Sequence, residues 1–149
     1  MPSSDHNSKL SRLRTNKEAF VYFLSKLDLE MAAALLEEDH TYQDMPRYQF
    51  LQKLEHALDR FLRAGDKYLF TYTGTCTSQS CGFGCQGIRL VGNVSGLYID
   101  LILKEVDGKL HDVYECHAFS TVSPPKTLRQ KVLIDTTDMP MWWMEDGED

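Results

Sequence analysis

The sequence predicts an α+β domain in which three N-terminal helices pack on an antiparallel sheet of four or more strands. Up to Gly65, apolar residues recur every three or four positions, which is the spacing of one buried helix face. After Gly65 the period changes to two, which is typical of half-buried strands. Because the helices precede the strands, they are expected to cover one face of the sheet.

Two helices are predicted before residue 40. The first covers residues 15–26, where Thr15 or Asn16 can cap the N-terminus and Glu18 is favourable in the first turn. Its apolar face consists of Phe20, Phe23, Leu24 and Leu27. The second, shorter helix starts near Asp28, and its apolar residues are Leu29, Ala32, Ala33 and Leu36.

The third predicted helix has the clearest boundaries. Asp44 and Pro46 mark its start, because proline is favoured where a backbone N–H is not needed. Gly65 follows its end, where a left-handed residue is commonly found. The apolar stripe between them comprises Phe50, Leu51, Leu54, Leu58, Phe61 and Leu62.

Four strands are predicted over residues 67–76, 86–92, 97–106 and 109–119. Asp107-Gly108 indicates a two-residue hairpin, because both positions favour a positive φ. The last three strands are therefore expected to form an antiparallel meander, and a cysteine-containing loop joins the first strand to the second. Further on, residues 132–134 fit either a short strand or part of a helix.

Composition limits the class of protein. A chain of 149 residues with 42% hydrophobic residues suits one packed domain. The net charge of -6 argues against nucleic acid or an anionic membrane as partners. No secretory signal and no apolar run of roughly 20 residues is found, so a cytoplasmic location is expected. The expected parts are a flexible segment (1–14), the domain (15–122) and a C-terminal extension with an acidic end (123–149).

The order of helix, short helix, helix and sheet resembles the NTF2-like superfamily, which is also called the cystatin-like or SnoaL-like cone. The residues that carry the resemblance are Leu35-Leu36, residues 39–42, Phe50-Leu51, Gly65-Asp66, residues 92–100 and residues 114–116. They look like small uncharacterised bacterial members. The resemblance implies a curved sheet and a pocket between the sheet and the long helix. Its members include isomerases, dehydratases, polyketide cyclases, binding proteins and interaction modules, so the fold does not select a function.

Four cysteines form the most specific chemical pattern. Cys76, Cys81 and Cys85 lie in and around one loop, and Cys116-His117 follows near the end of the last predicted strand. If the sheet curls so that these meet, four thiolates would suit a structural zinc ion, with His117 as a substitute ligand. Two alternatives stay open: Cys116 is a small buried apolar residue, or Cys81 and Cys85 form a redox-active pair.

Four polar residues are candidates for acid–base chemistry. His40 and Tyr42 lie between the second and third helices, and Asp100 and Asp112 lie on strands. A His40/Asp100 or a Tyr42/Asp112 pair would let one group remove a proton while the other stabilises the anion. The alternative is that both aspartates face solvent and keep one sheet surface soluble. Arg89 is expected either to line a polar pocket or to extend from the sheet surface.

Three hypotheses about function follow from these patterns. The first is a non-catalytic module that binds a small apolar ligand or a partner and is stiffened by zinc. The second is an acid–base enzyme of the isomerase or dehydratase type, and the third is a thiol redox sensor. Trp142 and Trp143 could anchor a homodimer, or they could fold back over the sheet.

Overall fold

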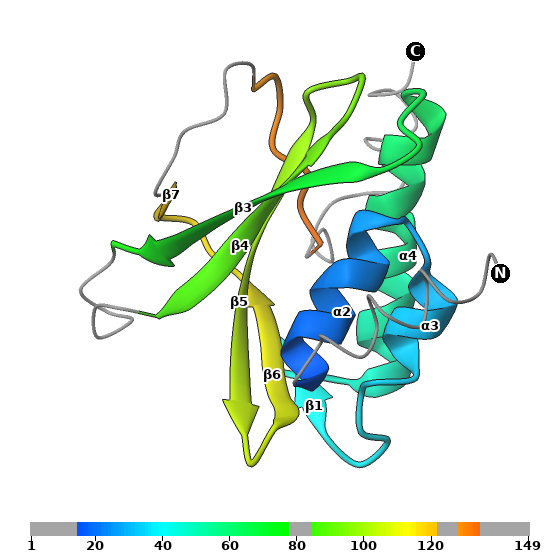
Figure 1. The fold of residues 1–149 in the computed structure, drawn as a ribbon. Helices are drawn as coiled ribbons and strands as arrows, with labels where there is room; N and C mark the ends of the chain where they lie inside the picture. The colour runs from blue at the N-terminus through cyan, green and yellow to red at the C-terminus, as the bar shows by residue number, and fades with distance from the viewer. Residues whose placement is uncertain (1–14, 78–84, 122–127, 135–149) are drawn as a thin grey trace, which may run out of the picture.

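The computed structural model describes residues 15–77, 85–121 and 128–134. Three helices lie on one side of a five-stranded antiparallel sheet, as Figure 1 shows, so the α+β class is confirmed. The expectations for residues 1–14, Cys81, Trp142, Trp143 and the acidic end fall outside the described residues. No helix in the described ranges is both long and apolar enough to cross a membrane.

The helices begin and end at local sequence signals. They are α2 (Asn16–Ser25), α3 (Leu29–Ala33) and α4 (Arg47–Arg63). The side chain of Thr15 accepts a hydrogen bond from Glu18 N at 3.2 Å, and that of Asp28 accepts one from Met31 N at 3.2 Å. Both are N-caps that satisfy a backbone donor of the first turn. Gly65, with φ of +95°, follows the end of α4 as the sequence predicts.

The sheet has five strands, which agrees with the predicted four or more. Its strands are β3 (Leu69–Cys76), β4 (Gln86–Gly92), β5 (Tyr98–Val106), β6 (Lys109–Glu115) and β7 (Phe119–Thr121), in the order β6-β5-β4-β3-β7. A separate two-residue hairpin, β1 (Thr41–Tyr42) and β2 (Met45–Pro46), precedes α4. Asp107 and Gly108 join β5 to β6 with φ of 55° and 78°, which confirms the predicted hairpin.

The prediction of one strand over residues 109–119 is wrong. β6 ends at Glu115, and the chain then crosses to the far edge of the sheet, where β7 pairs with β3. The reason is that residues 128–134 occupy the edge of β5 beyond β6. Tyr98 N–H donates to Gln130 O at 3.0 Å, and Val132 N–H donates to Tyr98 O at 2.6 Å. These residues belong to the expected C-terminal extension, yet Val132 and Ile134 are buried in the core.

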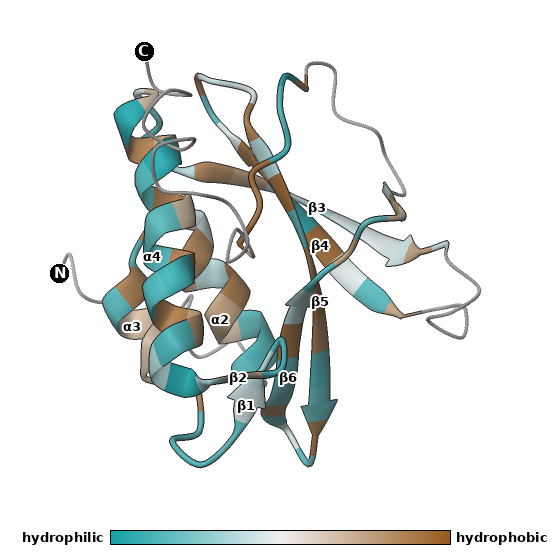
Figure 2. Cartoon of the chain, turned by 180° about the vertical axis from the view of Figure 1, so that it is seen from behind, coloured by the Kyte–Doolittle hydropathy of each residue, from teal (hydrophilic) through white to brown (hydrophobic). Residues whose placement is uncertain are grey.

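The two faces of the sheet have different environments. Ile99, Leu101 and Leu103 of β5 pack with the helices, and we call their side the helix face. Asp100 and Ile102 alternate with them and therefore point to the other side, the outer face. Figure 2 shows hydrophobic residues recurring along α4, β4 and β5. The largest fully buried side chains of the helix-face core include Phe20, Phe50, Phe61, Leu90 and Leu101.

Asp66 holds the turn between β4 and β5. It is only 2% exposed, and its Oδ1 accepts hydrogen bonds from Val94 N and Ser95 N, each at 2.8 Å. Its Oδ2 accepts from the hydroxyl of Ser95 at 2.5 Å. A Cβ on Gly92 would lie 2.0 Å from Asp66 Oδ2, so the close approach of the carboxylate requires glycine there. The turn therefore depends on a carboxylate that lies 28 positions before Val94 in the sequence.

Candidate functional site

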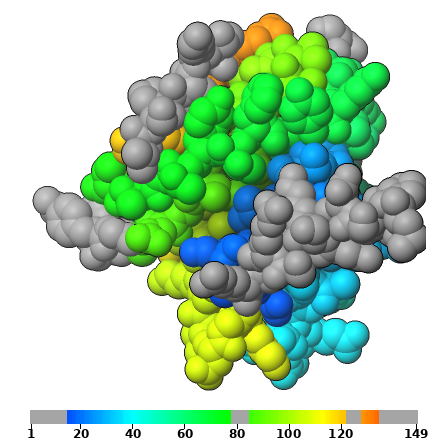
Figure 3. Space-filling model, in the orientation of Figure 1, coloured from blue at the N-terminus to red at the C-terminus, as the bar shows by residue number. Residues whose placement is uncertain are grey.

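A cleft of about 420 Å³ opens between α2 and the far end of the β3–β4 hairpin, and we call it the α2 cleft. Figure 3 shows the blue atoms of α2 beside the green atoms of that hairpin. Val21, Ile88 and Leu103 contribute apolar side chains to its lining. The remaining lining residues are Lys17, Glu18, Thr73, Gly74, Thr75, Gln86 and Gly87.

Two glycines contribute backbone to the lining of the α2 cleft, although a side chain at either position would point to the outer face, toward Ile102 and Phe119. Gly74 and Gly87 are paired across β3 and β4, and no side chain rises from either position. Both glycines are needed for close packing: a Cβ on Gly87 would lie 2.1 Å from Leu101 O, and one on Gly74 would lie 2.2 Å from Ser120 O. Glycine inside a strand signals such an approach, but this approach is on the outer face, so the pair does not account for the cleft.

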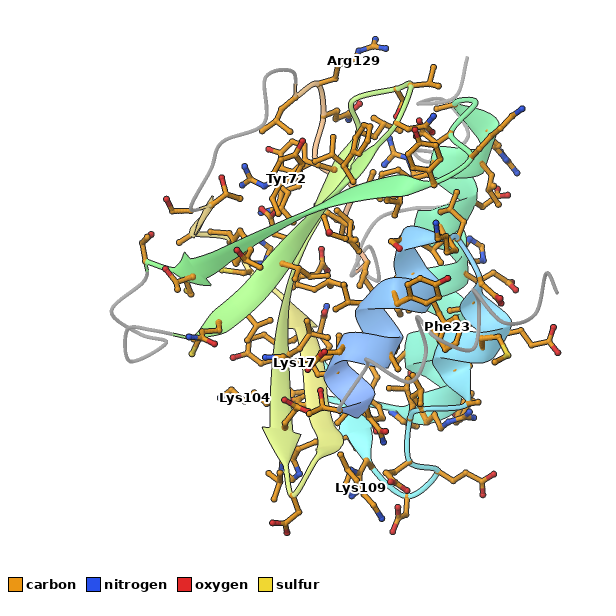
Figure 4. The ribbon with its side chains drawn as sticks, viewed as in Figure 1. Lys17, Phe23, Tyr72, Lys104, Lys109 and Arg129 are labelled. Atoms are coloured by element: carbon orange, nitrogen blue, oxygen red, sulfur yellow. The ribbon has the colours of Figure 1, made fainter. Side chains whose placement is uncertain are left out.

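A lysine and a glutamate meet beside the α2 cleft. Lys17 Nζ lies 3.9 Å from Glu105 Oε1, and both side chains are partly exposed. Figure 4 shows Lys17 on α2, at the side of the helix that adjoins the sheet. Glu105 Oε2 is buried and accepts no hydrogen bond from the described residues. A polar group of a ligand at this end of the cleft could therefore bind to the Lys17 ammonium group and the Glu105 carboxylate.

The predicted pair of His40 and Asp100 is separated by the sheet. His40 lies near the β5–β6 hairpin, with its ring centroid 5.4 Å from that of His111 and 6.4 Å from that of Tyr42. Tyr42 belongs to the helix-face core, whereas the Asp100 carboxylate lies on the outer face. The Nδ1 atom of His40 is buried and has no hydrogen-bond partner among the described residues.

The predicted pair of Tyr42 and Asp112 is not separated by the sheet, but both side chains form hydrogen bonds with the backbone. The hydroxyl of Tyr42 accepts a hydrogen bond from Glu37 N at 2.8 Å and donates one to Leu110 O at 3.4 Å. Burial raises the pKa of Tyr42 above its usual value, so the phenol stays neutral near pH 7. Asp112 accepts a hydrogen bond from Gln43 N at 3.1 Å. Both side chains thus fasten the β1 hairpin to β6.

Asp100 is buried, and the expectation that it faces solvent is wrong. It is 1% exposed, and Arg89 donates to both of its oxygens, at 2.6 and 3.1 Å. Lys131 Nζ lies 3.2 Å from Asp100 Oδ2. These three residues form what we call the Asp100 cluster. The hydrogen bond to Asp100 raises the pKa of Arg89, and the rings of Tyr98 and Phe119 lie near its guanidinium at 4.8 and 5.8 Å.

The Asp100 cluster connects four parts of the chain. Arg89 comes from β4, Asp100 from β5 and Lys131 from the segment beside β5. Lys131 also donates to Cys116 O at 2.6 Å, and Arg89 donates to Phe119 O at 3.4 Å. Every charged group of the cluster is therefore engaged with another part of the fold, which indicates a structural role.

Three of the four cysteines come together on the outer face. Cys76 ends β3, Cys85 lies opposite it, and Cys76 N–H donates to Cys85 O at 2.9 Å. Cys76 and Cys116 are buried in one small cluster with Ile102, against which Cys85 packs. Within residues 15–77, 85–121 and 128–134, no three His, Cys, Asp or Glu side chains are placed to hold a metal ion.

Comparison with known proteins gives no match, whether with family models, with curated proteins or with solved structures. The resemblance to the NTF2-like superfamily therefore stays a prediction.

Proposed function

We propose that this chain is a non-catalytic binding domain whose α2 cleft receives a small, largely apolar molecule. The single observation that carries the proposal is the cleft itself. Its volume of about 420 Å³ falls within the range of about 300–1,000 Å³ that is usual for small-molecule sites. Apolar side chains with a few polar groups at the edge are also the usual lining of such sites.

The arrangement of the polar residues favours binding over catalysis. An acid–base enzyme needs at least two titratable groups that converge on one pocket. None of His40, Tyr42, Asp100 and Asp112 lines the α2 cleft, and Lys17, which does line it, is paired with Glu105. Tyr42 and Asp100 are both committed to contacts within the fold. We further propose that the domain is an NTF2-like variant that acts in the cytoplasm, on the support of its order of helices and strands and of its composition.

Filling the α2 cleft is expected to abolish ligand binding without unfolding the protein. Thr75 lines the cleft from β3 and is exposed, and tryptophan is well accepted in strands. The fluorescent dye 8-anilinonaphthalene-1-sulfonate, which has an apolar ring system and one sulfonate, can serve as the probe. Thr75→Trp should weaken its binding by about tenfold or more, measured by fluorescence titration.

The matched control is Val94→Trp, which adds the same side chain at a site that is 68% exposed and outside the cleft. It should bind the dye as the wild-type protein does. Equal affinity of the Thr75→Trp and Val94→Trp proteins would show that the dye binds elsewhere, and the proposal would then fail.

We also propose that the cysteines hold a structural zinc ion. The support is that Cys116, from a distant part of the chain, shares one neighbourhood with Cys76 and Cys85. Cys81, which lies outside the described residues, would be the fourth ligand. Four thiolates would leave no open coordination position, so the ion would stiffen the loop and would take no part in a reaction.

Metal analysis of protein purified under reducing conditions without chelator tests the zinc site. About one zinc per chain is expected, and Cys116→Ser should lose most of it. His117→Ala is the control, because His117 is exposed and should not be needed while Cys116 is present. A wild-type protein without metal would overturn the zinc site and leave the thiol redox hypothesis as the alternative for these cysteines.

A further inference from the structure

In the part of the chain that the structure describes, the first half of β3 forms an open edge of the sheet. Asn93 N–H donates to Tyr68 O at 3.1 Å, and Cys76 N–H donates to Cys85 O at 2.9 Å. Because hydrogen-bonded positions alternate along an antiparallel strand, even-numbered residues of β3 direct their backbone groups to β4. Leu69, Thr71 and Thr73 therefore direct theirs away from β4.

No described strand pairs with that edge before Gly74. β7 pairs with β3 only at Gly74, Thr75 and Cys76. On the open side of residues 69–73, the described part of the chain supplies no hydrogen-bond partner for the backbone. Unpaired N–H and C=O groups in a row are a template for a further strand.

The open edge lacks the features that normally prevent strands from pairing between molecules. Such edges usually carry lysine, proline or a bulge. β3 has the sequence LFTYTGTC, without a charge or a proline, and its register with β4 is regular. Tyr68 and Phe70 are 42% and 44% exposed, and their rings are in edge-to-face contact with centroids 5.4 Å apart.

The opposite edge of the sheet gives a useful contrast. β6 begins with Lys109 and also carries His111 and Asp112. Hydrogen bonds from Gln43 to Asp112 and Glu115 attach the β1 hairpin to this strand. Among the described residues, one edge is thus charged and covered, whereas the other is uncharged and open.

We propose that a second copy of this chain pairs antiparallel with the β3 edge across a two-fold axis at Thr71. This register aligns residues 69–73 of the two copies and stops before Gly74, where β7 begins. Thr71 would exchange both backbone hydrogen bonds with the partner's Thr71. Phe70 would lie opposite the partner's Tyr72, which forms the aromatic cross-strand pair that stabilises sheets.

A copy of the same chain fits this edge for three reasons. An uncharged strand opposes no like charge when it meets itself, although the whole chain carries a net charge of -6. On one face Thr71 meets Thr71 and Leu69 meets Thr73, and on the other face Phe70 meets Tyr72. A two-fold axis also closes the assembly at two chains, because each copy has one such edge among the described strands.

Charge substitutions at Thr71 test the dimer, because this exposed side chain would face its own copy across the axis. Sedimentation equilibrium should show a concentration-dependent dimer of the wild-type chain. Thr71→Lys and Thr71→Glu should each weaken dimerisation by about tenfold or more, because like charges would lie directly opposite. An equimolar mixture of the two variants should dimerise again, because opposite charges would then meet.

Val106→Lys is the control, since Val106 is 53% exposed at the β5–β6 hairpin and is remote from β3 in the sheet. It should dimerise as the wild type does. Recovery in the mixture shows that each Thr71 variant is folded. A wild-type chain that stays monomeric at all concentrations, or a Thr71→Lys variant that matches Val106→Lys, would overturn the proposal.

Discussion

Replacing Asp100 by asparagine is expected to reduce the free energy of unfolding by about 3–5 kcal/mol. Asp100 is 1% exposed and is the carboxylate shared by Arg89 and Lys131, which are 13% and 23% exposed at their side chains. Removing its charge leaves two largely buried cations without a counter-ion, and the cost of their desolvation is no longer offset. Urea unfolding monitored by circular dichroism measures the change.

Asp59→Asn is the matched control for this prediction. Asp59 Oδ2 lies 2.7 Å from Arg63 Nε in an ion pair, but both side chains are largely exposed on α4. An exposed pair of this kind contributes about 0.5 kcal/mol. Similar losses in the two variants would contradict the view that Asp100 is a buried structural link.

Replacing Asp66 by alanine is expected to reduce the free energy of unfolding by about 3 kcal/mol. Its carboxylate accepts hydrogen bonds from the backbone of Val94 and from the backbone and hydroxyl of Ser95. Ser95 is itself buried, so its N–H would be left without a partner and without water. Hydrogen exchange should also become faster at the amides of Val94 and Ser95.

Asn93→Ala removes a comparable side-chain acceptor from the same turn. Asn93 Oδ1 accepts from Lys67 N at 2.9 Å and from Tyr68 N at 3.3 Å, and both contacts are exposed. Water can replace these bonds, so a loss of about 1 kcal/mol or less is expected. A larger loss for Asn93→Ala than for Asp66→Ala would show that the turn does not depend on the buried carboxylate.

The elements that the sequence predicts well are those with local causes. Thr15, Asp28 and Gly65 act within a few residues of the helix ends that they define, so their effect can be read from the neighbouring sequence. The hairpin at Asp107-Gly108 is similarly local. These signals do not depend on where the rest of the chain lies.

The break between β6 and β7 has a distant cause. Residues 116–118 continue the alternating pattern of β6, but the edge of β5 with which they would pair is occupied at Tyr98 by Gln130 and Val132. The burial of Asp100 is equally non-local, because it depends on Lys131, which is far along the chain. The meeting of Cys76, Cys85 and Cys116 accompanies the crossover from β6 to β7, which places Phe119 opposite Cys76 and which the sequence analysis did not predict.

The place of residues 128–134 beside β5 also bears on how the protein is made. Val132 and Ile134 are 0% and 1% exposed within the core that the helices share with the sheet. A nascent chain that has not yet reached these residues exposes the apolar surface that they cover and leaves the Asp100 carboxylate without Lys131. Completion of the core must therefore wait until synthesis has passed residue 134. Chains that terminate before Leu128 should become substrates for chaperones and proteases, because their core stays open.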